Sequence, residues 1–311
     1  MDMTRPSVSV VIATRNRKEY LSRLLESILA QDLRDWETII ADDGSSKETF
    51  EGYGEIQQRL DGRFHWMPCT PDAPASGPAA ARNRGIRIAR GQYIAFCDDD
   101  DYWIAPDHLS TAVQVLDRRD GDFLFGNLEG GYDWFPGCER WLCRYPVLEN
   151  PRVYEVSRAD LCATMKRHYP ILDTSVVRAE VIQRLGGFWE HVRYNEDMNF
   201  MLRLADVAKS IFYRDDKVAH LQVSDHPRIN NMLDGLDKDL ISAAAFQHAL
   251  AAVHTREAIG CARALQSWHL HRAAERLLAI GKDGPARILA TQSLAVQPSW
   301  SGLRTWCKTL V

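Results

Sequence analysis

Short apolar segments alternate with helical patterns through the first hundred residues of the chain. The predicted strands are Ser7–Ala13, Trp36–Ala41, Arg63–Met67 and Gln92–Phe96, and the predicted helices between them are Leu21–Leu29, Lys47–Leu60 and Ala79–Ala89. The first strand is a nearly continuous β-branched run, which is typical of a parallel strand buried on both faces. Strand–helix alternation predicts an α/β fold, with a Rossmann-like, mostly parallel sheet flanked by helices. In such sheets, ligands bind at the carboxyl ends of the strands.

Two acidic clusters stand at these carboxyl ends. Asp42 and Asp43 end the second strand, and the run Asp98–Asp101 follows the fourth. In an extended chain Asp98 and Asp100 point to the same face, where two like charges repel by roughly 1 to 4 kcal/mol near a surface. A hard cation such as Mg²⁺ or Mn²⁺ would compensate this repulsion and keep positions open for phosphate oxygens. A solvated acidic turn before the next helix explains the same residues equally well.

The composition of the 311-residue chain excludes several classes of protein. Hydrophobic residues make up 45%, which allows a large domain with a small one, or two medium ones. The net charge of −4, with no basic tail, argues against nucleic acid as the main partner. No apolar stretch approaches the roughly 20 residues of a membrane span, and the early first strand predicts no secretory signal. Seven scattered cysteines suit reduced thiols in a cytosol, without the spacing of a zinc site.

Two later segments are each open to two interpretations. Residues 121–169 are irregular and rich in aromatic side chains, which either pack a loop-rich subdomain or form a stacking surface for an acceptor. Glu196 and Asp197 follow Asn195, and this order suits the N-cap and first turn of a helix. In the other interpretation, the two carboxylates supply a base opposite the metal site.

Beyond residue 234 the pattern becomes helical throughout. Ala and Leu dominate Leu240–Leu250, Ala262–Ile280 and Pro285–Ala295, and the last two segments predict one helix hairpin of tetratricopeptide type. One hairpin is too few for a solenoid. We therefore predict two domains, an α/β domain of residues 1–234 and a small C-terminal helical extension of residues 235–311, which packs on the first domain or joins two copies as a homodimer.

Several short motifs occur along the chain in a characteristic order. They are Val10–Arg17, Asp42–Ser45, Ala81–Ile86, Gly91–Phe96 leading into the Asp-x-Asp cluster, Gly186–Phe188, Glu196–Asp197 and Arg203–Leu204. Each motif is weak singly, but in this order and spacing the chain resembles the large inverting glycosyltransferase family 2, of GT-A fold. The resemblance covers roughly residues 6–226. The C-terminal hairpin resembles tails of some bacterial members.

The resemblance implies a nucleotide-diphosphate sugar as donor, most often a UDP-sugar. The residues that would bind it are Ala13, Thr14, Arg15, Asp43, Arg82, Asp98 and Asp99. Asp43 would accept a hydrogen bond from the uracil imide, and Asp98 or Asp99 would hold the ribose. Asp100, with Asp98 as a further candidate, would bind the Mn²⁺ or Mg²⁺ that neutralises the departing diphosphate.

The resemblance also implies the catalytic groups and the setting of the reaction. Asp197 would take the proton of the acceptor hydroxyl as that oxygen attacks the anomeric carbon, and Glu196 would orient the site or the acceptor. Such general-base help typically contributes about 10²- to 10⁴-fold. The implied enzyme is a metal-dependent hexosyltransferase of bacterial cell-envelope polysaccharide biosynthesis, with a saccharide or lipid-linked acceptor. It would lie in the cytoplasm, either free or peripherally at the inner face of the membrane.

Some positions depart from the family's usual residues. Arg15 stands where Tyr is common, and Asp99 stands where Ser is common, so the register of the metal ligands is ambiguous by one residue. Many members carry a metal-binding histidine at a place that corresponds here to Ser224, with His220 and His226 nearby. The resemblance does not assign that ligand.

Two other functions remain as alternatives. The first is a non-catalytic module that binds a carbohydrate or nucleotide sugar and retains the GT-A fold, which the presence of Asp100 and Asp197 disfavours. The second is a dinucleotide-binding oxidoreductase. It is disfavoured because the sequence after the first strand, Ala13-Thr14-Arg15-Asn16, lacks the Gly-x-Gly-x-x-Gly pattern.

Overall fold

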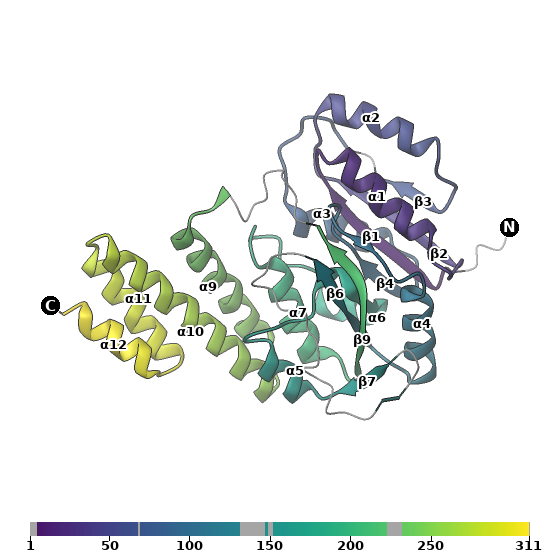
Figure 1. Ribbon diagram of the computed structural model, residues 1–311. Coiled ribbons are helices and arrows are strands. Elements are labelled where there is room, and N and C mark those ends of the chain that lie inside the picture. Colours follow the sequence, from purple (N-terminus) through teal and green to yellow (C-terminus); the bar gives the residue numbers. More distant parts are fainter. Residues whose placement is uncertain (1–4, 68, 131–146, 149–151, 223–231, 311) are drawn as a thin grey trace. The chain divides into compact units, whose positions relative to one another are not determined.

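The computed structural model describes residues 5–67, 69–130, 147–148, 152–222 and 232–310. The chain folds into two compact units, a sheet unit and a helical unit (Figure 1). The sheet unit comprises residues 1–157, 170–188 and 207–224, and the helical unit comprises residues 158–169, 189–206 and 225–311.

The sheet unit is built on one mixed sheet. Its strands are β1 (Val8–Thr14), β2 (Trp36–Asp42), β3 (Phe64–Trp66), β4 (Tyr93–Phe96), β5 (Tyr102–Trp103), β6 (Phe123–Gly130), β7 (Val153–Val156), β8 (Ser175–Arg178) and β9 (Ile211–Leu221). They lie in the order β3-β2-β1-β4-β8-β6-β9-β5, with β7 paired to β9. The four strands predicted from the alternation are parallel, whereas β8 runs antiparallel to both β4 and β6. The predicted α/β fold is confirmed, and its parallel part is the half that carries the acidic clusters.

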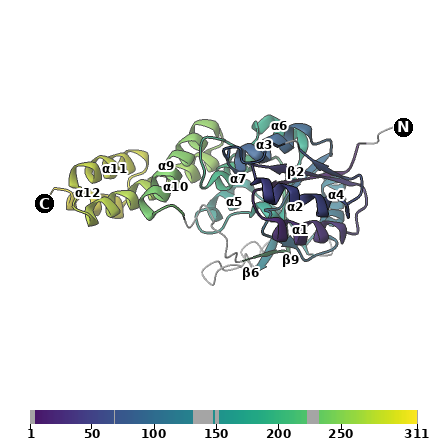
Figure 2. The ribbon, with the colours of Figure 1, turned by 90° about the horizontal axis from the view of Figure 1, so that it is seen from above.

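Helices cover both faces of this sheet (Figure 2). On one face lie α1 (Lys18–Leu29), α2 (Lys47–Gln57) and α4 (His108–Arg118), and on the other lie α3 (Pro78–Ile88) and α6 (Ala179–Leu185). Gly85 shows how closely α3 approaches the strands, because a Cβ there would come within 2.6 Å of the Val11 side chain. Both faces of β1 are therefore covered, as its β-branched sequence predicts.

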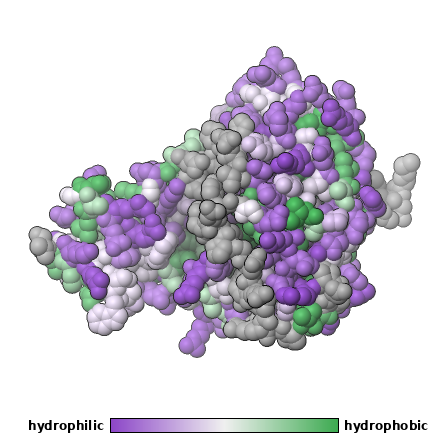
Figure 3. Space-filling model, in the orientation of Figure 1, coloured by the Kyte–Doolittle hydropathy of each residue, from purple (hydrophilic) through white to green (hydrophobic). Residues whose placement is uncertain are grey.

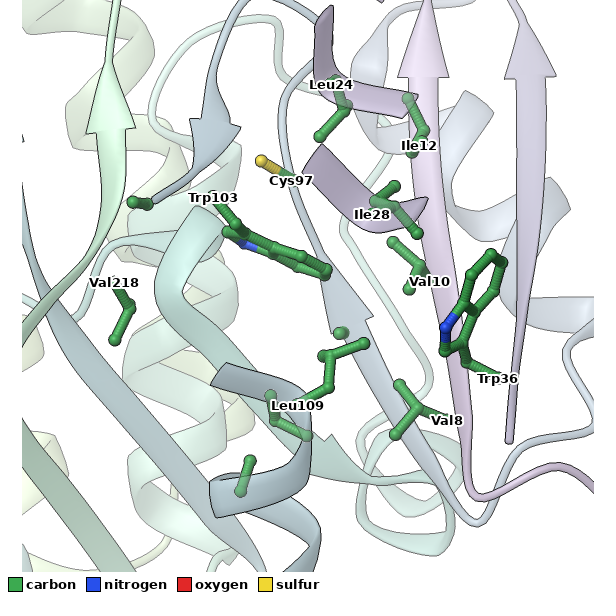
Figure 4. Close-up of a cluster of buried hydrophobic side chains, with 14 of the residues drawn as sticks. Val8, Val10, Ile12, Leu24, Ile28, Trp36, Cys97, Trp103, Leu109 and Val218 are labelled. Carbon is green, nitrogen blue, oxygen red and sulfur yellow. The ribbon is translucent and has the colours of Figure 1, made fainter. Parts of the chain in front are cut away.

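The main core lies between the sheet and α1. Val10 and Ile12 project from one face of β1 toward Leu24 and Ile28 of α1 (Figure 4). In α1 the buried positions recur at a spacing of three and four residues, which is the periodicity of a helix with one apolar face. At one end of this core Trp36 packs edge-to-face on a Phe ring, with centroids 5.3 Å apart.

His108 is a buried titratable group at the start of α4. Its ring packs edge-to-face against Trp103 at a centroid distance of 5.2 Å. Within the described parts of the chain, neither ring nitrogen has a hydrogen-bond partner. Burial lowers the pKa of His108 to about 3, and the positive charge of Arg214 acts in the same direction. The folded protein therefore holds this imidazole neutral.

We expect His108→Phe to make stability less sensitive to acid. The unfolded chain binds a proton near pH 6.5, whereas the folded chain binds it only near pH 3. The stability that depends on neutral His108 is therefore fully present above about pH 6.5 and is lost as the pH falls. Between pH 7 and pH 5 the loss is about 2 kcal/mol. Urea unfolding at both values should show this loss in the wild type only, and an equal loss in the variant would contradict the assignment.

The helical unit consists of helices packed around one long central helix. They are α5 (Arg158–Thr164), α7 (Glu196–Val207), α9 (Gly235–Ala252), α10 (Arg256–Ala279), α11 (Asp283–Val296) and α12 (Trp300–Lys308). The long helix α10 packs against α5, α9, α11 and α12. Among the described helices, none combines the length and the apolar character required to cross a membrane.

Two expectations about local structure need correction. Residues 121–169 are not irregular throughout, because β6, β7 and α5 form there; residues 131–146 and 149–151, with several of the aromatic side chains, lie outside the described residues. Glycine and charged residues interrupt β6, so its strand character comes from pairing with β8 and β9. The described residues after 234 form four helices; α10 and α11 correspond to the predicted hairpin, and α12 is a further helix that was not predicted.

The two compact units do not coincide with the two predicted domains. Helix α9 begins at Gly235, where Asp234 caps the amide of Asp237. However, α5 and α7 join the C-terminal helices, and Asp206 at the end of α7 accepts hydrogen bonds from the amides of His254 and Thr255, at 2.9 and 2.8 Å. The division into residues 1–234 and 235–311 stays a prediction.

Candidate functional site

The aspartates after β4 form a tight turn. The amide of Asp101 donates to the carbonyl of Asp98 at 3.1 Å, which closes the turn. The expectation of an extended segment with alternating faces is therefore wrong. Instead, the turn gathers Asp98, Asp100 and Asp101, which each offer a carboxylate oxygen within 4.8 Å of the others. Asp101 was not among the predicted metal ligands.

Asp99 points away from this three-carboxylate cluster (Asp98, Asp100 and Asp101). One of its oxygens accepts from the Thr14 hydroxyl at 2.8 Å, and the other accepts from the Arg17 guanidinium at 2.7 Å. Burial raises the pKa of Asp99 to about 6, and Arg17 opposes this shift. Arg17 also lies 3.1 Å from an oxygen of Asp100. Asp99 and Arg17 therefore tie the end of β1 to the acidic turn.

A further buried carboxylate supports the turn from another segment. Asp173, in the 3₁₀ helix Leu172–Thr174, accepts from the amide of Asp98 at 2.5 Å, and its carbonyl accepts from the Trp103 indole at 2.8 Å. Burial raises the pKa of Asp173, and the charge of Asp98 adds to the rise. Burial also raises the pKa of Asp101, and the negative charge of Asp173 adds to the rise. Carboxylates packed this closely repel one another, and a cation among them would remove that repulsion.

The three-carboxylate cluster fits a hard divalent cation. Mg²⁺ and Mn²⁺ prefer oxygen ligands and commonly use one or two carboxylates together with phosphate oxygens. Asp100 and Asp101 are buried, while the Asp98 side chain is 39% exposed and can face a ligand from solvent. A site for such a cation requires carboxylate oxygens, some of them buried and at least one open to a ligand, and the three aspartates meet both requirements.

Arg82 of α3 brings a positive charge to the same turn. Its guanidinium donates to Asp98 at 2.5 Å and lies over the Phe188 ring, 5.3 Å from the centroid. At the end of β1, Thr14 is buried, Ala13 is half-buried and Arg15 is exposed. The structure thus brings Thr14, Arg82, Asp98 and Asp99 into one connected group at the carboxyl edge of the sheet.

Asp43 is held by a loop that the motif did not reveal. Its Oδ1 accepts from the amide of Ser76 at 3.1 Å and from the Ser76 hydroxyl, and its Oδ2 accepts from the amide of Gly77 at 2.7 Å. Arg84 lies 3.4 Å from the same carboxylate. These donors fix the orientation of the Asp43 carboxylate.

Asn83 joins two of the sequence motifs inside the sheet unit. Its amide nitrogen donates to the carbonyl of Phe188 and its amide oxygen accepts from the Phe188 amide, both at 2.8 Å. The neighbouring Gly187 has a φ of +73°, and a Cβ there would come within 2.5 Å of the Asn83 oxygen. The Gly-Gly-Phe motif therefore lets the backbone approach this side chain closely.

We expect Asn83→Ala to destabilise the sheet unit by about 2 to 6 kcal/mol. The substitution leaves a buried N–H and a buried C=O of Phe188 without these partners, and each such group costs about 1–3 kcal/mol. Chemical unfolding monitored by circular dichroism measures the change. Gln57→Ala is the matched control, because that amide lies exposed at the end of α2 and its removal should alter stability by less than about 0.5 kcal/mol. Equal effects of the two substitutions would contradict the role of Asn83.

The predicted base lies in the helical unit. Glu196 and Asp197 form the first turn of α7, and Asp197 accepts from the amide of Met198 at 2.7 Å. The Tyr169 hydroxyl donates to its other oxygen at 3.5 Å. The charge of Asp197, with burial second, raises the pKa of Tyr169 well above its usual value. Asn195, whose amide donates to Ser242, has a φ of +59°, so the chain turns sharply just before both carboxylates.

Of the candidate histidines, the described one, His220, does not join the carboxylate cluster. His220 stacks on Tyr102 with centroids 4.9 Å apart, and its Nδ1 lies 3.5 Å from Glu129. Among the described residues, the cluster of potential metal ligands contains aspartates alone. His226 and Ser224 lie outside the described residues.

Sequence reasoning assigned no role to three residues of this site. Arg17 stands inside the first motif and Asp101 is the last of the four aspartates, so both were visible as sequence signals. Asp173 lies in no sequence motif. Its place beside the aspartate turn becomes visible only in the fold, where the 3₁₀ helix before β8 contacts β4.

Comparisons with known proteins agree with this architecture. A UDP-Glc:alpha-D-GlcNAc-diphosphoundecaprenol beta-1,3-glucosyltransferase, WfaP of Escherichia coli, is 34% identical over 120 residues, which are 39% of this chain and 45% of that protein. This chain thus spans less than half the length of that relative.

Two solved structures share the fold. The structure of S. aureus TarS 1-349 in complex with UDP-GlcNAc has a TM-score of 0.63 and 17% identity, covering 98% of this chain and 79% of that one. The mannosyltransferase PcManGT from Pyrobaculum calidifontis, in complex with GDP-Man and Mn²⁺, has a TM-score of 0.60 and 19% identity, covering 99% and 85%. The predicted GT-A fold is confirmed. Residues 9–165, half of the chain, match the model of glycosyl transferase family 2, and the chain belongs to that family.

Proposed function

We propose that this chain is an inverting glycosyltransferase that moves a sugar from a nucleotide-diphosphate sugar to a hydroxyl of a saccharide or lipid-linked acceptor. The observation that carries the proposal is the turn that gathers Asp98, Asp100 and Asp101 at the carboxyl edge of the sheet. The solved relatives bind UDP-GlcNAc and GDP-Man, and the named E. coli relative uses UDP-Glc and a diphosphoundecaprenol-linked sugar. These names favour a UDP-sugar donor.

Residues at the strand ends bind the donor in this proposal. Asp43 accepts a hydrogen bond from the base imide, because its carboxylate is already oriented by Ser76 and Gly77. Ala13, Thr14 and Arg15 line the base and ribose. Of the two candidates for the ribose, Asp98 is the more accessible, since both oxygens of Asp99 are engaged by β1 and Arg17. Arg82 holds Asp98 in place beside the nucleotide.

The three-carboxylate cluster is the proposed cation site. Asp98, Asp100 and Asp101 would hold Mg²⁺ or Mn²⁺, which when bound neutralises charge on the departing diphosphate. Arg17, 3.1 Å from Asp100, keeps the cluster from carrying its full negative charge. Asp173 fixes the backbone of the turn through the amide of Asp98.

Asp197 is the proposed general base. As the acceptor oxygen forms its bond to the anomeric carbon, its proton moves to the Asp197 carboxylate, and the bond from that carbon to the diphosphate oxygen breaks with its electron pair leaving on the diphosphate. The Met198 amide and the Tyr169 hydroxyl each donate to this carboxylate, which holds its orientation. Glu196, buried in the same helical turn, orients the site.

Calorimetric titration with UDP and with GDP, each in Mn²⁺ and in chelator, tests the proposal. The expected result is UDP binding in Mn²⁺ that chelator weakens strongly, with GDP binding more weakly. Release of UDP from UDP-sugars is then measured with candidate acceptors. Failure of both nucleotides to bind in Mn²⁺ would contradict the proposed donor site, and UDP-sugar binding without any transfer would favour a binding module.

A further inference from the structure

Helix α12 has its large apolar side chains on the outside. Gly302, Thr305 and Thr309 are buried against the neighbouring helices, whereas Trp300 is 87% exposed and Leu303 is 41% exposed. A surface helix of a globular protein usually turns its apolar stripe inward and its polar residues outward. This helix does the reverse, so folding of the chain alone does not account for its outer face.

The orientation of α12 is fixed by specific contacts in the helical unit. The Ser299 hydroxyl caps the amide of Gly302 at 3.0 Å, and the Trp306 indole donates to the Thr291 hydroxyl of α11 at 3.0 Å. The Arg287 guanidinium of α11 donates to the carbonyl of Thr309. At Gly302 a Cβ would come within 3.1 Å of the α11 side chain Leu294, so the small face of α12 must lie against α11.

The outer face of α12 combines apolar and basic side chains. At 100° per residue, Trp300 and Leu303 fall on one stripe, and the exposed side chains of Arg304 and Lys308 follow along its edge. Leu310, which is 53% exposed, follows two residues beyond the end of the helix. Exposed hydrophobic side chains lie among hydrophilic ones at the end of the helical unit formed by α11 and α12 (Figure 3). Residues 280–310 carry four basic side chains against one acidic one, although the whole chain has a net charge of −4. The basic charge is thus concentrated beside the exposed apolar stripe.

We propose that the outer face of α12, the stripe of Trp300 and Leu303 with Arg304 and Lys308 at its edge, binds an anionic lipid surface together with Leu310 just beyond the helix. Tryptophan and leucine on one side with Lys and Arg beside them is the pattern of a helix that lies in a membrane interface. Tryptophan partitions to the headgroup region, and each basic side chain is attracted to anionic lipid.

A second copy of the chain is a poorer match for this face. A parallel two-fold contact through α12 places both Arg304 and Lys308 beside the same residues of the other copy, and an antiparallel one centred on the helix brings the two Arg304 side chains together, so like charges repel. A nine-residue helix is only about 14 Å long, which is too little for the roughly 800 Å² that each partner buries in a stable interface. An anionic lipid surface meets both the charge and the size of the face. The inference rests on α12 alone and does not depend on the proposed transfer reaction.

Co-sedimentation of the full chain with vesicles tests the inference. Vesicles of phosphatidylcholine mixed with phosphatidylglycerol are compared with vesicles of phosphatidylcholine alone, at low and at high salt. The wild type should bind the anionic vesicles and be released by salt. Arg304→Glu with Lys308→Glu should weaken this binding by about 30-fold or more, since each basic side chain lost contributes about tenfold or less and the reversal adds repulsion.

Matched variants separate the α12 face from general effects. Trp300→Ser with Leu303→Ser should also abolish binding, whereas Ile88→Ser, at an exposed apolar position on α3, should leave it unchanged. Lys47→Glu with Arg59→Glu is the charge control, because both side chains are exposed in the sheet unit. Circular dichroism and UDP titration of every variant report whether it is folded.

Three outcomes would overturn the inference. The first is that the wild type does not bind anionic vesicles. The second is binding that the α12 variants and their controls change to the same extent. The third is a dimer, detected by sedimentation velocity without lipid, that Trp300→Ser with Leu303→Ser dissociates, because the face would then belong to a second copy.

Discussion

The Asp197→Asn variant should lose transfer activity by about 10²- to 10⁴-fold, the range typical of a positioned general base. Asparagine keeps the shape of the side chain and can still accept from the Met198 amide, but it cannot take a proton from the acceptor. UDP affinity should stay close to that of the wild type, because in the proposed mechanism Asp197 acts on the acceptor. Release of UDP from the preferred UDP-sugar in the presence of acceptor measures the first effect, and calorimetry measures the second.

Helix stability offers a competing explanation for Asp197, and one control separates the two. Asp197 lies in the first turn of α7, where any carboxylate interacts favourably with the amide end of the helix. Glu180 occupies the first turn of α6 and is exposed, so Glu180→Gln removes the same kind of interaction elsewhere. Retention of full activity by Asp197→Asn, or an equal loss in both variants, would show that Asp197 is not the base.

Asp100→Asn should abolish the metal dependence of nucleotide binding. Loss of a residue that supports a metal ligand costs about 10- to 100-fold in metal affinity, and loss of a buried ligand is expected to cost at least about 100-fold. Asparagine retains an oxygen of similar position but carries no charge, so the cluster of Asp98, Asp100 and Asp101 would hold a divalent cation poorly. Calorimetric titration of UDP in Mn²⁺ and in chelator measures the difference between the two conditions.

Asp32→Asn is the control for this substitution, because that carboxylate is exposed in the loop before β2 and lies outside the cluster. It should leave both the UDP affinity and its dependence on Mn²⁺ unchanged. Titration of Mn²⁺ into each protein without nucleotide gives a second readout that does not depend on catalysis. Mn²⁺-dependent UDP binding by Asp100→Asn that equals the wild type would remove Asp100 from the metal site.

Local sequence patterns predicted the elements of the parallel half of the sheet well. The strand predicted at Trp36–Ala41 is observed at Trp36–Asp42, and the helix predicted at Ala79–Ala89 is observed at Pro78–Ile88. Such elements can be predicted because a β-branched run or apolar residues at helical spacing are patterns of side chains that are close together along the chain. β6 was missed because its character depends on the distant strands beside it.

The site was predictable in its residue types and less so in its geometry. Four consecutive aspartates after a buried strand suggested either a cation site or an acidic turn, and their place at a carboxyl end of the sheet favoured the cation site. Whether those aspartates alternate or turn is decided by backbone hydrogen bonds, here from Asp101 to Asp98 and from Asp98 to Asp173. The turn replaces the predicted same-face pair of Asp98 and Asp100 with a cluster of three.

The sequence by itself determined the α/β class, the family and the strand ends at which the acidic clusters lie, because each of these follows from short patterns of residues that are close together along the chain. Only the tertiary structure decided that Asp99 pairs with Thr14 and Arg17, that Ser76 and Gly77 hold Asp43, and that small residues of α12 face inward. Each of these contacts joins side chains whose proximity depends on strand order and helix packing. Periodicity along the chain cannot report such proximity, since it records only which face of an element is buried.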